Sequence, residues 1–228
     1  MSKRVINPGM VKDVMYGLPV MIRHDYQDER DKFIEQFVEQ SIQKAMEYFN
    51  RGGVTIDVGC AYGYAVKRFE DMGYKAIGID KYVDGYRMSE NIIHDDFYRI
   101  SCILESESCD NVFINHTLEH AENAIALVYQ IFKIMKMGGI VFVAVPDGNY
   151  EWAWDLRDST THFSCFTPKF LESLFARYGF ETLYLDNVEL EPKRDNERVE
   201  IWYVGRKVKT IEEASMDFME VMKNGAKD

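Results

Sequence analysis

The feature that most constrains the fold is an alternation between short β-branched apolar runs and longer segments with apolar residues every three or four positions. The first run, Val54–Val58, precedes a helical stripe over Gly63–Met72, and Lys75–Ile79 is a second strand-like run. Strands that alternate with helices form β-α-β units, with helices on both faces of a mainly parallel sheet. The sequence therefore predicts an α/β fold in which ligands bind beyond the carboxyl ends of the strands.

The rest of the chain continues this pattern. Apolar spacing predicts an amphipathic helix over Asp31–Phe49, whereas residues 1–30 lack a clear period and are expected to form an irregular arm. Further strands are expected at Asn91–His94, Val112–Ile114, Ile140–Val145, Glu181–Leu185 and Val199–Val208, and further helices at Glu122–Lys136 (closed by Gly138-Gly139), Phe166–Tyr178 and Ile211–Met222. We expect one structural domain, in which residues 1–50 cover a ligand site built by residues 51–228.

Composition removes several classes of function. The chain has 228 residues and a formal net charge of −11, and 46 % of its residues are hydrophobic, which is too apolar for a disordered protein. The acidic balance disfavours binding to nucleic acid, because that binding depends on Lys and Arg at phosphates. The longest apolar run, Ile140–Val145, is too short to span a membrane, and the four cysteines form no Cys-x-x-Cys pair. We expect a cytoplasmic protein without a signal peptide, membrane segment or metal cluster.

The first two strand ends carry residues typical of a nucleoside site. The turn after the first strand reads Asp57-Val58-Gly59-Cys60-Ala61-Tyr62-Gly63, and Asp80 follows the second strand 21 residues after Gly59. Glycines allow close approach of a ligand to the backbone, and an acid at the second strand end is placed to accept hydrogen bonds from ribose hydroxyls. An ordinary tight turn and a helix-capping Asp80 would give the same residues without a ligand.

The turn differs from that of a dinucleotide-binding protein. Such a protein uses Gly-x-Gly-x-x-Gly, whose second Gly leaves room for a pyrophosphate. Here Gly59, Ala61 and Gly63 occupy alternate positions, and Asp57 precedes the first of them. An acid at this turn would repel a pyrophosphate and attract an amine, so the turn favours a nucleoside without a pyrophosphate.

On these residues the chain resembles the class I S-adenosylmethionine-dependent methyltransferases, and looks most like the branch of ubiquinone- and menaquinone-biosynthesis and small-molecule methyltransferases. The matching segments, between about residues 54 and 180, are Asp57–Gly63 with Ala61 in place of the middle Gly, Gly78–Asp80, His94–Phe97, Asn115–His120, Lys136–Pro146 and His162–Phe180. The resemblance implies a Rossmann-like, seven-stranded, mostly parallel sheet whose last strand is antiparallel.

The resemblance also implies roles for individual residues toward S-adenosylmethionine. Asp57 and the backbone of Gly59, Cys60, Ala61 and Gly63 would hold the methionine part, and Asp80 with the following Lys81 would lie at the ribose. Asp96, or the adjacent Asp95, would accept from the adenine amino group beside Phe97. Asn115 and His116 would lie near the sulfonium.

The histidines allow more than one interpretation. His116-x-x-Glu119-His120 spells an inverted zinc-protease motif, but a strand ends just before His116 and no third ligand is evident. We therefore expect no metal site and assign the pair Glu119-His120 to packing or capping. His162 and His116 are candidate bases for the acceptor, since histidine titrates near neutral pH, although a capping or packing role is favoured for His162.

The substrate side is less defined. Tyr150, Trp152 and Trp154 follow the fifth strand and could form an aromatic wall over an acceptor, or pack on the sheet. We expect in-line methyl transfer to O, N or C of a small molecule, releasing S-adenosylhomocysteine, by a monomer or homodimer. The alternatives are an inactive binding subunit with a methyltransferase fold and an NAD-dependent oxidoreductase.

Overall fold

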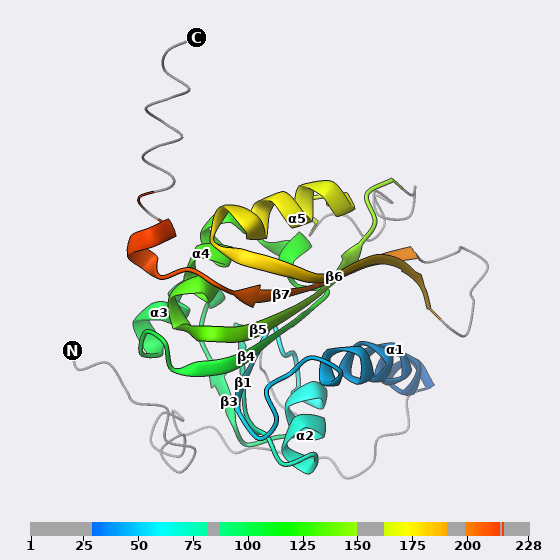
Figure 1. The fold of residues 1–228 in the computed structure, drawn as a ribbon. Helices are drawn as coiled ribbons and strands as arrows, with labels where there is room; N and C mark the ends of the chain where they lie inside the picture. The colour runs from blue at the N-terminus through cyan, green and yellow to red at the C-terminus, as the bar shows by residue number, and fades with distance from the viewer. Residues whose placement is uncertain (1–28, 82–86, 150–161, 191–198, 215, 217–228) are drawn as a thin grey trace.

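The chain forms one seven-stranded sheet with helices on both faces, as the computed structural model shows (Figure 1). The structure describes residues 29–81, 87–149, 162–190, 199–214 and 216. The strand order is β3-β2-β1-β4-β5-β7-β6. The predicted α/β fold and the predicted number of strands are confirmed.

Five neighbouring strands are parallel, and they form the half of the sheet that carries the nucleoside motifs. They are β1 (Val54–Val58), β2 (Lys75–Asp80), β3 (Ile92–His94), β4 (Cys109–Asn115) and β5 (Met135–Pro146). Because these strands run in one direction, Asp57, Asp80, His94 and Asn115 come to the same edge of the sheet.

The antiparallel strand lies in the other half of the sheet, beyond β5. β7 (Val199–Lys207) runs antiparallel to β5 and to β6 (Phe180–Glu189), as predicted for the last strand. Since β7 runs the opposite way, its first residues lie at the edge where the parallel strands end, and Pro146 pairs with Glu200 there.

The helices cover the two faces separately (Figure 1). α1 (Glu29–Met46) and α2 (Tyr64–Asp71) cover one face, while α3 (Ile100–Ile103), α4 (Ala124–Ile134) and α5 (Pro168–Arg177) cover the other. Successive residues of β4 alternate between the two cores: Val112 and Ile114 pack toward α4, and Phe113 stacks on the α2 side. This period of two is the pattern of a strand buried on both faces.

Side-chain pairs fix the first helix to the domain. Arg68 of α2 donates from two nitrogens to the Glu39 carboxylate of α1, each at 2.8 Å. Ile42, Ala45 and Phe49 bury against the sheet in the same region. The arm at residues 1–28 lies outside the described residues, so its expected position over the site stays a prediction.

Two predicted element bounds are wrong. The helix expected to reach Lys136 ends at Ile134, and β5 begins at Met135, so Gly138 and Gly139 lie inside the strand and do not close the helix. The fully buried Lys207 explains the early end, because its Nζ donates to the carbonyls of Phe132 (3.0 Å) and Met135 (2.7 Å). Of the last predicted helix, residues 211–214 are helical and most of the remainder lies outside the described residues.

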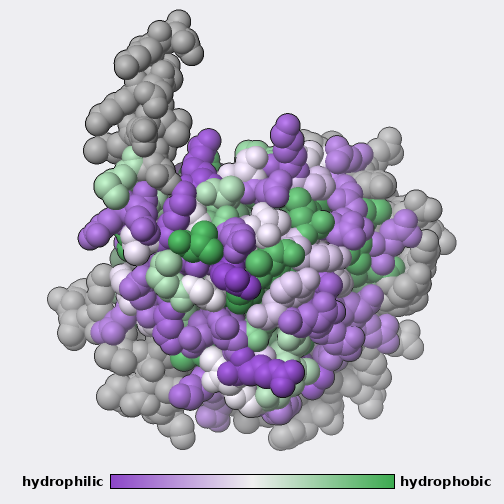
Figure 2. Space-filling view, viewed as in Figure 1, coloured by the Kyte–Doolittle hydropathy of each residue, from purple (hydrophilic) through white to green (hydrophobic). Residues whose placement is uncertain are grey.

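The described surface is mostly polar. Figure 2 shows hydrophilic residues over most of one face, with small separate hydrophobic spots. Among the described residues, no helix is long and apolar enough to cross a membrane.

Candidate functional site

The turn between β1 and α2 adopts the left-handed conformations that its glycines predicted. Gly59 has φ 75°, Ala61 φ 46° and Gly63 φ 88°. The Gly59 amide donates to the Ile79 carbonyl at 2.8 Å, which holds the turn against the end of β2. A Cβ on Gly59 would lie 2.2 Å from Oγ1 of Thr117, so only glycine allows the segment after β4 to approach this closely. Ala61 is the departure from the family pattern and occupies a conformation that glycine adopts without strain.

Asp80 lies directly beside this turn, although 20 residues separate it from Cys60 in the chain. Its Oδ2 accepts a hydrogen bond from the Ala61 amide at 2.8 Å. The glycine turn and the acid after the second strand, which the sequence predicted to form one site, are therefore in direct contact.

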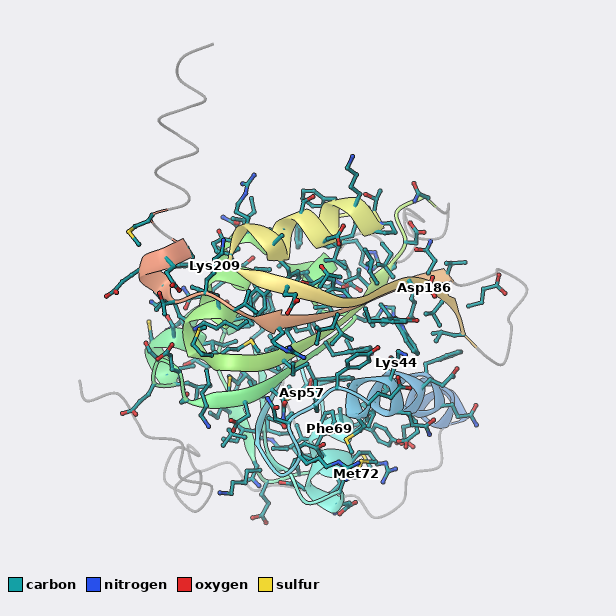
Figure 3. All side chains as sticks on the ribbon, viewed as in Figure 1. Lys44, Asp57, Phe69, Met72, Asp186 and Lys209 are labelled. Atoms are coloured by element: carbon teal, nitrogen blue, oxygen red, sulfur yellow. The ribbon has the colours of Figure 1, made fainter. Side chains whose placement is uncertain are left out.

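Asp57 is a buried acid at the end of β1. Asp57 is 4 % exposed and lies on β1, which α2 covers (Figure 3). Burial, and secondly the nearby charge of Asp80, raise the pKa of Asp57 from 3.8 to about 8. Burial also raises the pKa of the Cys60 thiol well above its usual value, with the charges of Asp57 and Asp80 adding to the effect. Two acids thus lie close together at this turn, and a cationic ligand would favour their charged forms.

The third strand end positions the residues expected at an adenine ring. Asp96 caps the short η2 helix (Phe97–Arg99) by accepting from the Tyr98 amide at 2.9 Å. Asp95 instead pairs with Arg99 at 2.9 Å, and Phe97 is buried. Lys81 lies with its Nζ 5.8 Å from the centre of the Phe97 ring.

The end of β4 carries an unsatisfied polar atom. Asn115 Oδ1 is buried and has no hydrogen-bond partner, whereas buried side-chain oxygens normally have one. A bound molecule at this strand end would supply the missing donor.

His116 follows Asn115 in a left-handed conformation, with φ 50°. Its Nε2 lies 2.5 Å from Oε1 of Glu200 and its Nδ1 lies 3.2 Å from Oε1 of Glu119. Burial alone would lower the pKa of His116, but the charge of Glu200, its hydrogen bond to His116 and the nearby Glu119 carboxylate outweigh burial and raise this pKa well above its usual value. Trp202 Nε1 donates to the other oxygen of Glu200 at 2.9 Å, which fixes the glutamate.

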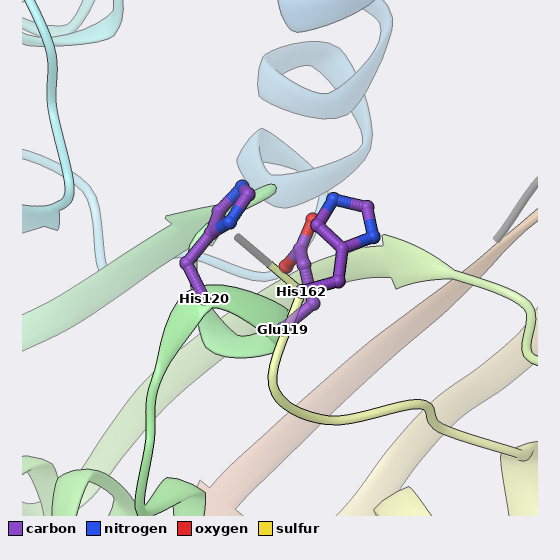
Figure 4. A group of neighbouring side chains, drawn as sticks. All are labelled: Glu119, His120 and His162. Carbon is purple, nitrogen blue, oxygen red and sulfur yellow. The ribbon is translucent and has the colours of Figure 1, made fainter. Parts of the chain in front are cut away.

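The inverted zinc-protease interpretation of His116 and His120 does not hold, because His116 lies in a turn and points to Glu200. A different group gathers instead. Ligand atoms of Glu119, His120 and His162 lie within 4.8 Å of one another (Figure 4). Glu119 and His120 come from the η3 turn (Leu118–His120), and the His120 and His162 rings lie 4.7 Å apart between centroids.

Comparison with known proteins decides the family. A family model described as a methyltransferase domain matches residues 26–185, which is most of the chain. The chain belongs to this methyltransferase family. No curated protein matches it in sequence.

Solved structures share the methyltransferase fold at low sequence identity. An S-adenosylmethionine-dependent methyltransferase from Archaeoglobus fulgidus is 19 % identical, with a TM-score of 0.64 over 79 % of this chain and 100 % of that one. The Burkholderia thailandensis 1,6-didemethyltoxoflavin-N1-methyltransferase, solved with its substrate and S-adenosylhomocysteine, is 14 % identical, with a TM-score of 0.61 over 85 % of this chain and 94 % of that one.

A third structure is a complex with a protein partner. A chain of the Haloferax volcanii complex between the Trm112 methyltransferase activator and a proposed methyltransferase is 18 % identical, with a TM-score of 0.64 over 80 % of this chain and 95 % of that one. Together these structures confirm the class I methyltransferase fold predicted from the sequence, whereas the ubiquinone-type branch stays a prediction.

The described residues of this methyltransferase fit S-adenosylmethionine, the cofactor named for the first of these structures. A cationic sulfonium and an ammonium suit the buried Asp57, and the orphan oxygen of Asn115 lies at the neighbouring strand end. The roles of individual residues stay predictions. Tyr150, Trp152 and Trp154 lie outside the described residues.

The sequence interpretation missed two parts of this edge. No role was predicted for Glu200, yet it is 2 % exposed and holds His116. The feature that could have indicated its role is its position at the start of the antiparallel last strand, because that strand begins where the parallel strands end. His162 was expected to be a base or a capping or packing residue, and nothing in its spacing from Glu119 and His120 predicted that the three lie together.

Proposed function

We propose that the protein transfers a methyl group from S-adenosylmethionine to a small-molecule acceptor. The observation that carries this proposal is the buried Asp57 carboxyl beside a left-handed glycine turn, with Asp80 bonded to that turn at 2.8 Å. This arrangement suits a cationic nucleoside and opposes a pyrophosphate, which also argues against an NAD-dependent oxidoreductase.

Each cofactor contact follows from position along the sheet edge. The Gly59–Gly63 turn and Asp57 bind the methionine part, and Asp80 accepts from the ribose hydroxyls, with Lys81 beside it. Asp96 accepts from the adenine amino group, with Phe97 at the ring. Asp96 is favoured over Asp95 because Asp95 is engaged by Arg99. Asn115 and His116 lie nearest the sulfonium.

The chemistry is a displacement at one carbon. An acceptor atom attacks the methyl carbon as the carbon–sulfur bond breaks, and the bonding electrons pass to sulfur to give neutral S-adenosylhomocysteine. The cofactor supplies the reactive group, so the protein's work is to align the two partners and exclude water.

An O or N acceptor also loses a proton. His116 and His162 were both candidates to take it. Because His116 is held between two glutamates that raise its pKa and favour its protonated form, it suits the role of a base less well than His162 does. His162 is therefore the candidate to act on the acceptor.

A small acceptor is favoured over a polyanion by the net charge of −11. The Burkholderia neighbour acts on the small molecule 1,6-didemethyltoxoflavin, which supports this choice. We place the acceptor beneath the segment that contains Tyr150, Trp152 and Trp154, and assign the arm in residues 1–50 to covering it. We infer a monomer or homodimer in the cytoplasm.

Calorimetry tests the proposal directly. We expect S-adenosylhomocysteine to bind and NAD not to bind, and Asp80→Ala to weaken the S-adenosylhomocysteine affinity by at least about tenfold, as loss of charged hydrogen bonds requires. Asp186→Ala is the matched control, because Asp186 is exposed on β6, an outermost strand that β7, β5, β4 and β1 separate from β2 and its Asp80. Absence of binding, or equal affinity in Asp80→Ala and wild type, would sink the proposal. Turnover of labelled S-adenosylmethionine against a panel of small metabolites then separates an enzyme from an inactive binding subunit.

A further inference from the structure

The cluster of Glu119, His120 and His162 is not used by the cofactor site. It is built by two backbone hydrogen bonds: the amides of Phe163 and Ser164 donate to the Glu119 carbonyl at 2.8 and 3.1 Å. These bonds fix the segment that carries His162 against the η3 turn, although about 40 residues separate the two in the chain. Figure 4 shows the three side chains gathered at the end of β4.

Glu119 is the unusual member. The residue is 1 % exposed, and neither of its carboxylate oxygens has a hydrogen-bond partner. Its Oε1 lies 3.2 Å from His116 Nδ1, and that histidine is shared with Glu200. A buried carboxylate without hydrogen bonds is costly unless a cation or donor compensates it. Because His116 lies between two buried glutamates, one imidazole serves two carboxylates, so the Glu119 carboxylate points to a further positive partner on the side of His120 and His162.

Two imidazoles and one carboxylate are the donor set of open metal sites. Catalytic zinc sites use three such ligands and leave a fourth position for water or substrate, and the same set binds other first-row divalent ions. Mg²⁺ prefers oxygen ligands and suits this cluster poorly.

We propose that Glu119, His120 and His162 bind one divalent transition-metal ion of the Zn²⁺ class. Ligand atoms around such an ion lie about 2.0–2.2 Å from it. The three donor atoms, now within 4.8 Å of one another, therefore move closer together when the ion binds. The structure thus assigns a metal site where the sequence predicted none, with His162 as the third ligand in place of His116.

The position suggests what the ion does, and this step rests on the proposed function. Thr117, two residues before Glu119, packs against Gly59 of the cofactor turn. The open position of the ion then holds the acceptor hydroxyl beside the methyl group. Coordination lowers the pKa of the hydroxyl, and its proton passes to solvent. The resulting oxygen attacks the methyl carbon, and the carbon–sulfur electrons stay on sulfur. In this arrangement His162 binds the ion and does not take the proton itself.

Metal binding is measured on the whole chain, after stripping with a chelator. We expect the wild type to take up one equivalent of Zn²⁺ by calorimetry, to give a Co²⁺ absorption spectrum typical of nitrogen and oxygen ligands, and to show no response to Mg²⁺. Glu119→Gln and His162→Ala should each weaken Zn²⁺ binding by more than about tenfold, the loss that even supporting residues of metal sites cause. His94→Ala is the matched control, because His94 is exposed on β3 with its Nε2 2.8 Å from the Lys81 carbonyl.

Several results would overturn the proposal. Substoichiometric Zn²⁺ uptake by the wild type would do so whatever the variants do. Equal Zn²⁺ affinity in the wild type and in Glu119→Gln or His162→Ala would do so as well. Glu119→Asp, which keeps a carboxylate, should retain more affinity than Glu119→Gln and guards against a folding defect. Binding of S-adenosylhomocysteine, measured in the same samples, keeps the two proposals apart: cofactor binding without metal binding refutes only the metal site.

Discussion

The buried carboxyl of Asp57 makes the stability of the protein depend on pH in an unusual direction. In the folded chain its pKa is raised from 3.8 to about 8, mainly by burial. Unfolding returns the group to water, where it loses its proton near its ordinary value. Between about pH 4 and pH 8 the folded state therefore binds more protons than the unfolded state. The contribution of this group to the free energy of unfolding thus falls as pH rises through this range and stays constant above about pH 8.

Asp57→Asn isolates the effect, because the amide mimics the protonated acid and cannot ionise. One proton contributes a slope of about 1.4 kcal/mol per pH unit, so from pH 5 to pH 7 the wild type should lose up to about 2.7 kcal/mol that the variant keeps. The free energy of unfolding of the variant relative to the wild type should rise by that amount across the same interval.

Urea denaturation at pH 5, 6 and 7 measures this difference for wild type, Asp57→Asn and the exposed control Asp186→Asn. All other titrating groups are shared, so they cancel in the subtraction. The free energy of unfolding of the Asp186→Asn control should change with pH in parallel with that of the wild type. If the Asp57→Asn curve is also parallel to the wild type, the acid ionises normally in the folded chain and the argument from its burial is wrong. A cationic cofactor should release this proton on binding at pH 7, which calorimetry in two buffers of different ionisation enthalpy would detect.

Two further predictions concern stability alone. Ala61→Gly should stabilise the protein by about 0.5–1 kcal/mol, because Ala61 has φ 46° and glycine adopts that conformation without steric cost; thermal unfolding checks it, and a destabilised variant would show that the methyl group contributes favourable packing. Lys207→Met should destabilise by about 1–3 kcal/mol, since two buried carbonyls at the end of α4 lose their donor. An unchanged midpoint in urea would contradict that account of the helix end.

The fold was predictable because local pattern and global topology agree. The run Val54–Val58 is a strand on its composition alone, and the turn after it needs glycine at Gly59 for a reason visible in the structure, its contact with Thr117. The pairing of Asp80 with that turn follows from parallel strands ending at one edge.

Other features depend on contacts that spacing does not encode. The helix before β5 ends four residues before Gly138, since a lysine from the last strand caps it and Met135 already pairs with Cys109. The ion pair of Asp95 with Arg99, which distinguishes it from the adjacent Asp96, is likewise not encoded in spacing, and the choice between them at adenine stays a prediction. The approach of His162 to Glu119 depends on backbone hydrogen bonds between segments far apart in the chain, and the periodicity of side chains does not predict such bonds.

The contact between His116 and Glu200 has a consequence for how the protein is made. The glutamate belongs to β7, and it reaches the site because that strand runs against its neighbours. A ribosome delivers residues in order, so every described residue proposed for the cofactor emerges before Glu200 does. A nascent chain that has formed its parallel strands still holds His116 without this partner. The site is therefore completed only after β7 has been made, and a chain truncated before β7 would lack the His116–Glu200 contact even with the whole nucleoside turn in place.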